Sequence, residues 1–308
     1  MQDSLIKSRA EAMRANKLKL HLGKTINATI ITLGSLMLIA GVLKFIYRLP
    51  EISISDMAMS AIGIVALMVA KSKACVNFLI HPHSNANIER TILAIGIFTC
   101  IGITAVKIFL GDSEFYQNSL DENSLIEWLT FLLLIVSAYI HACIGLTNEF
   151  KGGRRYFYAT SFALFFLGME ELSWGQMVFK WETPNQLALI NSQGETTLHN
   201  IYGINTLIDP LLLLALTVAI LLTIFLKTDN RKSAIDSYAL EIITPSKSIL
   251  PVISFAWIIA SYIVLNPSGS LLQRGEIEWS EFLISFAVVM HSIQLLIRLC
   301  NKHAEQRI

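Results

Sequence analysis

Charged side chains are scarce in this chain, and their scarcity excludes an ordinary soluble domain. They make up 15% of the 308 residues, against about 25% in a typical soluble domain. Hydrophobic residues make up 54%, and long apolar runs recur along the whole sequence, which is typical of a multi-pass membrane protein. The formal net charge is +1, so there is no basic excess to bind nucleic acid, and we expect no nucleic-acid partner.

Several other features are missing. The four cysteines, Cys75, Cys100, Cys143 and Cys300, lack metal-ligand spacing, and we expect no disulfides. The sequence contains no phosphate-binding loop, no dinucleotide fingerprint and no Gly-x-Ser-x-Gly element. The sequence therefore predicts no particular cofactor and does not indicate whether a metal is required.

The apolar runs predict an all-α fold, an integral membrane bundle of eight transmembrane helices within a single membrane domain, residues 1–308. Each run approaches the roughly 20 residues that a helix needs to cross a bilayer. The predicted spans are 26–47, 57–74, 91–110, 125–147, 156–179, 207–226, 249–266 and 281–300.

Basic residues predict the orientation of these spans. Of the 24 Lys and Arg residues, 19 lie in the two terminal segments, in the even-numbered loops or within the last four residues of a span that leads into one of them; three lie in the other loops, and two, Lys44 and Lys107, lie within spans 26–47 and 91–110. Because positive residues collect on the cytoplasmic side, both termini are expected in the cytoplasm, with the protein in a plasma or inner membrane. Residues 1–25 form a cytoplasmic amphipathic N-terminus, and 180–206 is the longest loop outside.

Two adjacent glutamates, Glu170 and Glu171, interrupt the fifth predicted span. Glu170 follows Tyr156 by 14 residues, about 21 Å of helix, in a hydrocarbon core about 30 Å thick. A carboxylate at this depth is costly and commonly functional, so the pair should face a cavity open to the outside. Such a pair can transfer a proton or bind a cation. Lys107 and Lys44 lie at similar depth and are candidate counter-charges.

On a continuous helix through residue 179, Glu170, Ser173, Trp174 and Met177 would share one face. The loop that follows begins with Thr183-Pro184, a pattern that predicts a short helix over 185–190. Thr196 or Thr197 could cap a further helix over 198–205, with His199 in its first turn. The candidate catalytic residues are Glu170, Glu171 and His199; the candidate substrate-binding residues are Ser173, Trp174, Gln176, Asn191, Gln193, Glu195 and Asn200.

Two other outer loops contain charged residues. Loop 111–124 is acidic, with no basic residue, and is expected to be a solvated surface loop. Arg274, Glu276, Glu278 and Glu281 form a charged cluster near the last span. A cavity mouth would suit this cluster, but we interpret it too as a solvated loop.

The pattern Glu-Glu-x-Ser-Trp-Gly-Gln at 170–176, then Glu-Thr-Pro at 182–184 and Asn-x-Gln-x-Glu-Thr-x-Leu-His-Asn at 191–200, resembles a family of multi-pass membrane proteins. The resemblance covers about a tenth of the chain. That family is uncharacterised, so the resemblance implies a membrane protein and carries no activity or residue roles.

These features favour an enzyme, a hydrolase or transferase that acts on a lipid or lipid-linked substrate at the outer leaflet through a site formed by Glu170, Glu171 and His199. Its expected partner is the lipid bilayer with such a substrate. One alternative is a proton- or cation-coupled transporter or channel that uses the glutamate pair. Another is a non-catalytic assembly or effector protein whose loop 180–206 binds a partner.

Overall fold

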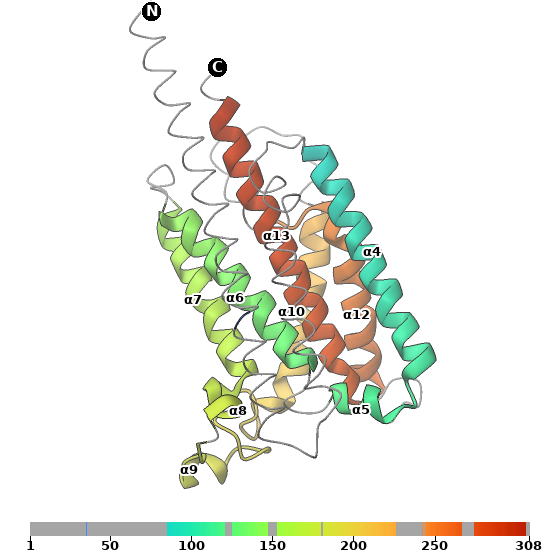
Figure 1. Ribbon diagram of the computed structural model, residues 1–308, viewed down its shortest axis with the longest axis vertical. Helices are drawn as coiled ribbons and strands as arrows, with labels where there is room; N and C mark the ends of the chain where they lie inside the picture. The colour runs from blue at the N-terminus through green and yellow to red at the C-terminus, as the bar shows by residue number, and fades with distance from the viewer. Residues whose placement is uncertain are drawn as a thin grey trace, which may run out of the picture. The chain divides into compact units, whose positions relative to one another are not determined.

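The computed structural model describes residues 85–120, 125–146, 153–179, 181–225, 244–266 and 274–305, together with residues 35 and 242. Six of its helices are long (Figure 1): α4 (Asn85–Leu110), α6 (Leu125–Leu146), α7 (Arg154–Glu171), α10 (Asn205–Phe225), α12 (Leu250–Leu265) and α13 (Ile277–Glu305). Short helical elements connect them: α5 (Glu114–Leu120), η2 (Ser173–Gly175), α8 (Gln176–Phe179), α9 (Asn185–Ala188), η3 (Lys247–Ile249) and η4 (Arg274–Glu276). The described residues are thus helices joined by turns, as the sequence predicts.

Five helices are long and apolar enough to cross a membrane, as expected of an integral membrane protein. They correspond to the predicted spans 91–110, 125–147, 207–226, 249–266 and 281–300. Helix α7 occupies part of the predicted span 156–179 and is not among the five, because its 18 residues include two arginines at the start and two glutamates at the end. The predicted spans 26–47 and 57–74, and the N-terminal segment 1–25, lie outside the described residues.

The chain divides into two compact units, and the boundaries between them fall within α4, α6, α7 and α13. Among the described residues, the first unit holds Tyr139–Ser161 and α13 from Ser292 onward, and the second holds Glu89–Ala138 and Phe162–His291. In the first unit, Arg154 Nε donates to the Gly145 carbonyl over 3.0 Å, which joins the start of α7 to the end of α6. All the candidate site residues among the described residues lie in the second unit.

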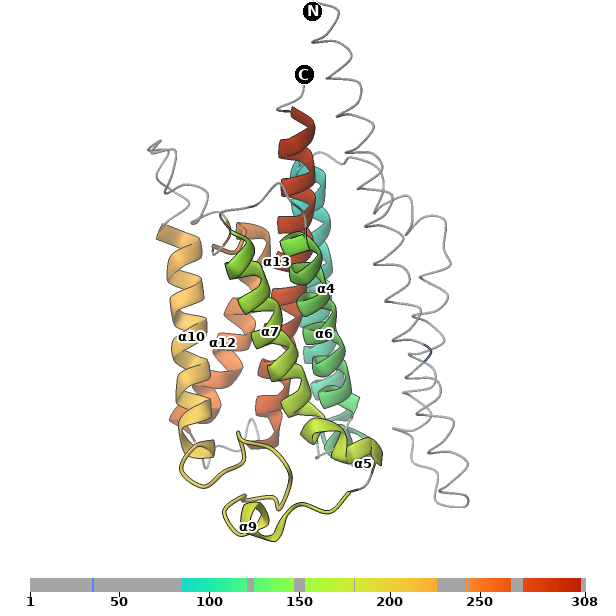
Figure 2. The same cartoon turned by 90° about the vertical axis from the view of Figure 1, so that its left-hand side faces the viewer.

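In the second unit, α10 and α12 lie side by side in both views (Figure 1 and Figure 2). Trp257 Nε1 of α12 donates to Thr217 Oγ1 of α10 over 2.9 Å. Ser280 Oγ of α13 donates to the Ala256 carbonyl of α12 over 3.0 Å. Hydrogen bonds of this kind are common between membrane helices, where side-chain polar groups have few other partners.

Helix α10 has two distinct faces. Large exposed side chains recur on one face at helical spacing: Leu207, Leu211, Leu214, Val218, Leu221 and Phe225. An exposed apolar stripe of this length is suited to contact with lipid chains rather than water. The opposite face contains the buried residues Leu216 and Thr223, so α10 has a lipid-facing side and an inward side.

The short helices α5 and η4 contain buried residues, although the segments in which they lie were expected to be solvated. Tyr116 in α5 is 1% exposed, and so is Glu276 in η4. Tyr116 Oη donates to Glu276 Oε1 over 2.5 Å, and Lys107 Nζ of α4 pairs with the same oxygen at 2.8 Å. The interpretation of loop 111–124 and of the charged cluster that includes Glu276 as solvated loops was therefore wrong at Tyr116 and Glu276. A carboxylate that is paired with a cation and accepts a hydrogen bond from a phenol can be buried.

This cluster of Lys107, Tyr116 and Glu276 is extended by Trp279, whose Nε1 donates to Tyr116 Oη over 3.1 Å. Burial and the hydrogen bond to Glu276 raise the pKa of the Tyr116 phenol well above its ordinary value. The phenol therefore stays protonated and donates its proton to the carboxylate. The cluster joins α4, α5 and the start of α13.

We expect Glu276→Gln to destabilise the protein by about 2–3 kcal/mol, because the change leaves the Lys107 ammonium without its buried partner. The control is Glu114→Gln, an exposed residue of the same loop region, which should cost only a few tenths of a kcal/mol as one end charge of α5. Thermal unfolding in detergent measures both. Equal midpoints for the two variants would contradict a structural role for Glu276.

Candidate functional site

Helix α7 ends immediately after the two glutamates. Ser173 and Trp174 have φ of 48° and 57°, and Gly175 has φ of 92°. These left-handed residues break the helix, so the expected continuous helix through residue 179, with a shared face from Glu170 to Met177, was wrong. A left-handed conformation costs a non-glycine residue about 1–2 kcal/mol, so other contacts must hold Ser173 and Trp174 in place.

Glu170 makes one of these contacts, a hydrogen bond with Trp174. Its side chain is buried, and its carboxylate accepts hydrogen bonds from three residues. Trp174 Nε1 donates to Oε1 over 2.5 Å. The backbone amides of Leu198 and His199 donate to Oε2 over 2.7 and 3.2 Å, and His199 Nδ1 lies 3.3 Å from the same oxygen. Glu170 thus binds the end of the loop back onto α7.

Three more hydrogen bonds join the break to the loop. Ser173 Oγ donates to Glu195 Oε2 over 2.7 Å. Gln176 uses both ends of its amide: Oε1 accepts from the Thr196 backbone over 2.8 Å, and Nε2 donates to Thr183 Oγ1 over 2.8 Å. Because Thr183 is engaged in this way, it does not cap α9, whose N-cap residue is Pro184.

Within the loop, Asn191 organises a tight turn. Its Oδ1 accepts from the backbone amides of Gln193 and Glu195 over 3.0 and 3.2 Å, and its Nδ2 donates to the Thr197 carbonyl over 2.8 Å. Gln193 Oε1 in turn accepts from Asn200 Nδ2. Most polar residues of the 170–200 pattern, which carries the family resemblance, therefore form hydrogen bonds with one another. These hydrogen bonds are enough to explain the spacing of the polar residues in the pattern.

The path of the loop differs partly from the expectation. The short helix after Pro184 is present as α9, ending at Ala188. The expected helix over 198–205 was wrong: an isolated antiparallel bridge joins Asn191 to Ile201, turns follow, and α10 begins at Asn205. His199 is consequently held by Glu170 and not by a helix N-terminus. In Figure 2 the loop carrying α9 leads from the end of α7 to the start of α10.

This loop exposes several large hydrophobic side chains. Its large exposed hydrophobic residues are Trp181, Leu189, Ile190, Leu198, Tyr202 and Ile204. The Trp181 ring stacks on Phe179 with centroids 5.7 Å apart. Aromatic and aliphatic side chains exposed on a polar-cored loop are typical of a segment lying at a membrane interface.

Glu171 has different surroundings from its neighbour. Its carboxylate lies within electrostatic range of Glu281, Glu127 and Glu170. Glu278 is similarly close to Glu281, Glu127, Glu171 and Asp209. We call Glu127, Glu171, Asp209, Glu278 and Glu281 the acidic cluster; its members come from α6, α7, α10 and α13. None of Glu171, Glu278 and Glu281 has a Lys or Arg ion-pair partner within the described part of the chain.

His199 interacts with Glu170 and with one member of the acidic cluster. Its side chain is 40% exposed while Glu170 is 7% exposed, and its imidazole is attracted to Glu281. A histidine whose Nδ1 faces a buried carboxylate has its ring orientation fixed, and its Nε2 is then available for proton transfer. The arrangement can therefore orient an imidazole and present it beside further carboxyl groups.

Lys107 pairs with Glu276, and not with Glu170 or Glu171, which differs from the pairing that depth alone suggested. Lys44 lies outside the described residues. In the described ranges, no group of three or more His, Cys, Asp or Glu side chains is arranged to hold a metal ion.

One buried hydroxyl near the acidic cluster has no partner. Thr130 is 1% exposed and its Oγ1 makes no hydrogen bond within the described structure. It lies one helical turn from Glu127, on the side of α6 where Leu134 packs against Leu164 of α7. An unsatisfied buried hydroxyl is unfavourable by about 1–3 kcal/mol.

Comparison of the chain with protein-family models, curated proteins and solved structures finds no match.

Sequence reasoning did not include Glu127, Asp209, Glu278 and Glu281 in the site. A signal was present, because the predicted topology puts each of them at the outer end of a span, on the side where span five carries Glu171. Their separation along the chain concealed the cluster.

The two adjacent glutamates allow a matched test. In Glu170→Gln the amide cannot accept all the donors that now converge on the carboxylate, so exchange of the Leu198 and His199 amides should accelerate by about 10–100-fold, the loss expected for hydrogen bonds to a charged group. Glu171→Gln should leave these amides protected, because Glu171 makes no hydrogen bond to the loop in the described structure. Hydrogen–deuterium exchange in nanodiscs measures both. Equal protection in the two variants would contradict this role for Glu170.

Proposed function

We propose that the protein is a membrane-embedded hydrolase or transferase that acts on a lipid or lipid-linked substrate at the outer leaflet. The observation that carries this proposal is the pairing of His199 Nδ1 with Glu170 Oε2 at 3.3 Å, beside the acidic cluster. A buried carboxylate that orients a half-exposed imidazole is an arrangement used for general base catalysis.

In this proposal Glu170 is the positioning residue for His199. His199 Nε2 takes the proton of the attacking water or acceptor hydroxyl. A carboxyl group of the acidic cluster, Glu171 or Glu281, gives a proton to the leaving oxygen, because closely packed carboxyl groups share protons rather than all ionising. Water, or a second substrate hydroxyl, supplies the group that replaces the leaving group.

The bilayer setting supports a lipid substrate. The site lies where α7 ends and α10 begins, beside a loop that exposes several large hydrophobic side chains. The distribution of Lys and Arg favours a topology of eight spans with cytoplasmic termini, which would place this loop at the outer leaflet. A substrate arriving from the membrane would then reach His199 without crossing bulk water.

A second candidate function, proton- or cation-coupled transport, is favoured by one observation. Glu171, Glu278 and Glu281 come from two helices and repel one another, and such a group can bind and release a cation. If this reading holds, Glu171→Gln abolishes ion flux in proteoliposomes while His199→Ala leaves most of it. Absence of flux with the unaltered protein would contradict it.

For the enzyme proposal, we expect His199→Ala to lower turnover by about 10²–10⁴-fold, the usual contribution of a proton-transfer group. Glu171→Gln should also lower it, and Glu170→Gln should lower it less, through misorientation of His199. The measurement is mass spectrometry of lipids in nanodiscs prepared from a native membrane extract.

The matched control for His199→Ala is Tyr202→Phe, in the same loop with an exposed ring, which should retain full activity. Lipid turnover that is equal in His199→Ala and the unaltered protein, with both folded, would end the proposal.

A further inference from the structure

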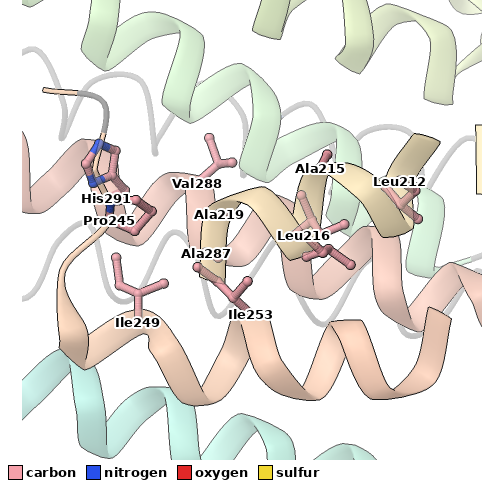
Figure 3. A pocket seen from close by; sticks show the side chains of 11 residues that line it. Leu212, Ala215, Leu216, Ala219, Pro245, Ile249, Ile253, Ala287, Val288 and His291 are labelled. Carbon is pink, nitrogen blue, oxygen red and sulfur yellow. The ribbon is translucent and has the colours of Figure 1, made fainter. Parts of the chain in front are cut away.

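An apolar cavity of about 290 Å³ lies between α10, α12 and α13 in the second unit. Ten of its eleven lining residues are apolar, and the other is His291. In Figure 3, His291 and Pro245 lie at one end of the cavity and Leu212 at the other, with Ala215, Ala219 and Ala287 between them. The cavity is partly open rather than enclosed.

The nature of the lining restricts what can fill this cavity. The three helices are among those long and apolar enough to cross a membrane, so their surroundings are hydrocarbon. Apolar cavities do not hold water readily, whereas a hydrocarbon chain gains from filling them. The volume is at the low end of the range of about 300–1,000 Å³ for ligand pockets, so it suits one chain.

The register of two helices places the cavity one helical turn from the acidic cluster. On α13, Glu281, Ile284, Val288 and His291 follow one another at intervals of three, four and three residues, so they lie on one face. Ile284, Val288 and His291 line the cavity, and Glu281 of the acidic cluster lies one turn beyond its end.

Helix α10 repeats the same spacing. Asp209, Leu212, Leu216 and Ala219 lie on one face, and the last three line the cavity. Asp209 and Glu281 lie close enough to repel each other. On α10 and on α13, one helix face therefore carries a carboxylate followed by the residues that line the cavity. The lining segment of each helix advances by seven residues, which is about 10 Å of helix.

We infer that this cavity binds the hydrocarbon chain of the lipid substrate, one acyl or prenyl chain, while its headgroup lies at His199 and the acidic cluster. This inference rests on the proposed function and names its substrate class: an amphiphile with a neutral or cationic headgroup, rich in hydroxyl or amine groups. A phosphate headgroup is disfavoured, because the neighbouring carboxylates repel it.

At the far end, His291 closes the cavity. Its Nε2 donates to the Ile242 carbonyl over 2.8 Å, which fixes the ring across the end of the apolar channel. The position of His291 thus limits how far a chain can enter.

The inference can be tested with three photoactivatable long-chain probes in nanodiscs: an amine, an alcohol and a phosphate monoester, each with a diazirine on the chain. We expect labelling in the peptides that contain 212–219 and 284–291, stronger for the amine and alcohol than for the phosphate. Ala219→Trp fills the cavity and should reduce labelling by about tenfold or more, since excluding two methylene groups already corresponds to that factor.

Leu214→Trp is the matched control, because Leu214 is exposed on the opposite side of α10 and its replacement should leave labelling unchanged. If Ala219→Trp does not fold, Ala287→Leu is the milder variant that occupies the same cavity. Labelling that neither cavity variant reduces would overturn the chain site, and equal labelling by the phosphate probe would overturn the headgroup class.

Photolabelling measures binding of the chain, and mass spectrometry of lipids measures turnover, so the two properties are tested separately. His199→Ala should retain labelling of 212–219 and 284–291 while turnover is lost. If His199→Ala retains turnover as well, the proposed function fails while the chain site stands. If the cavity variants retain labelling while His199→Ala loses turnover, the chain site fails and the proposed function stands.

Discussion

The bonding of the buried Glu170 carboxylate fixes the geometry of the whole candidate site. An ionised group removed from water must be satisfied by donors, and the donors come from Trp174 and from the loop backbone at Leu198 and His199. Trp174 reaches Glu170 from a left-handed backbone position, so the end of α7 is coupled to the same bond. One carboxylate thus connects the loop, the break and the imidazole.

The two adjacent glutamates therefore have different tasks, although the sequence makes them look equivalent. They differ by about 100° around α7, so one carboxylate meets the returning loop and the other lies near Glu281 and Glu127. Hydrogen bonds leave Glu170 little freedom to exchange protons, whereas the charged groups that act on Glu171 are other carboxylates. In the proposed function, Glu170 positions His199 and Glu171 can transfer a proton. The end of α7 holds these two residues side by side.

The apolar runs predicted α4, α6, α10, α12 and α13, because hydrophobic length alone decides whether a helix can span a bilayer. The break after Glu171 was not predictable in that way, since Leu172 and Met177 continue the apolar pattern. The contacts that hold the break include hydrogen bonds to Glu170 from donors 28 and 29 residues away. The burial of Glu276 was missed for the same reason: its partner Tyr116 is 160 residues distant. Local composition carries no information on such pairs.

The register of α10 and α13 connects the polar site to the apolar cavity. In both helices a carboxylate precedes the cavity-lining residues by three positions, so both change from polar to apolar at the same level. In an amphiphile, the polar headgroup is joined directly to the apolar chain. A site that binds both parts must therefore change from polar to apolar at the depth where the headgroup meets the chain. Inserting one residue after Glu281 would rotate Ile284, Val288 and His291 by about 100° away from the cavity, so the boundary depends on helix periodicity as much as on residue type.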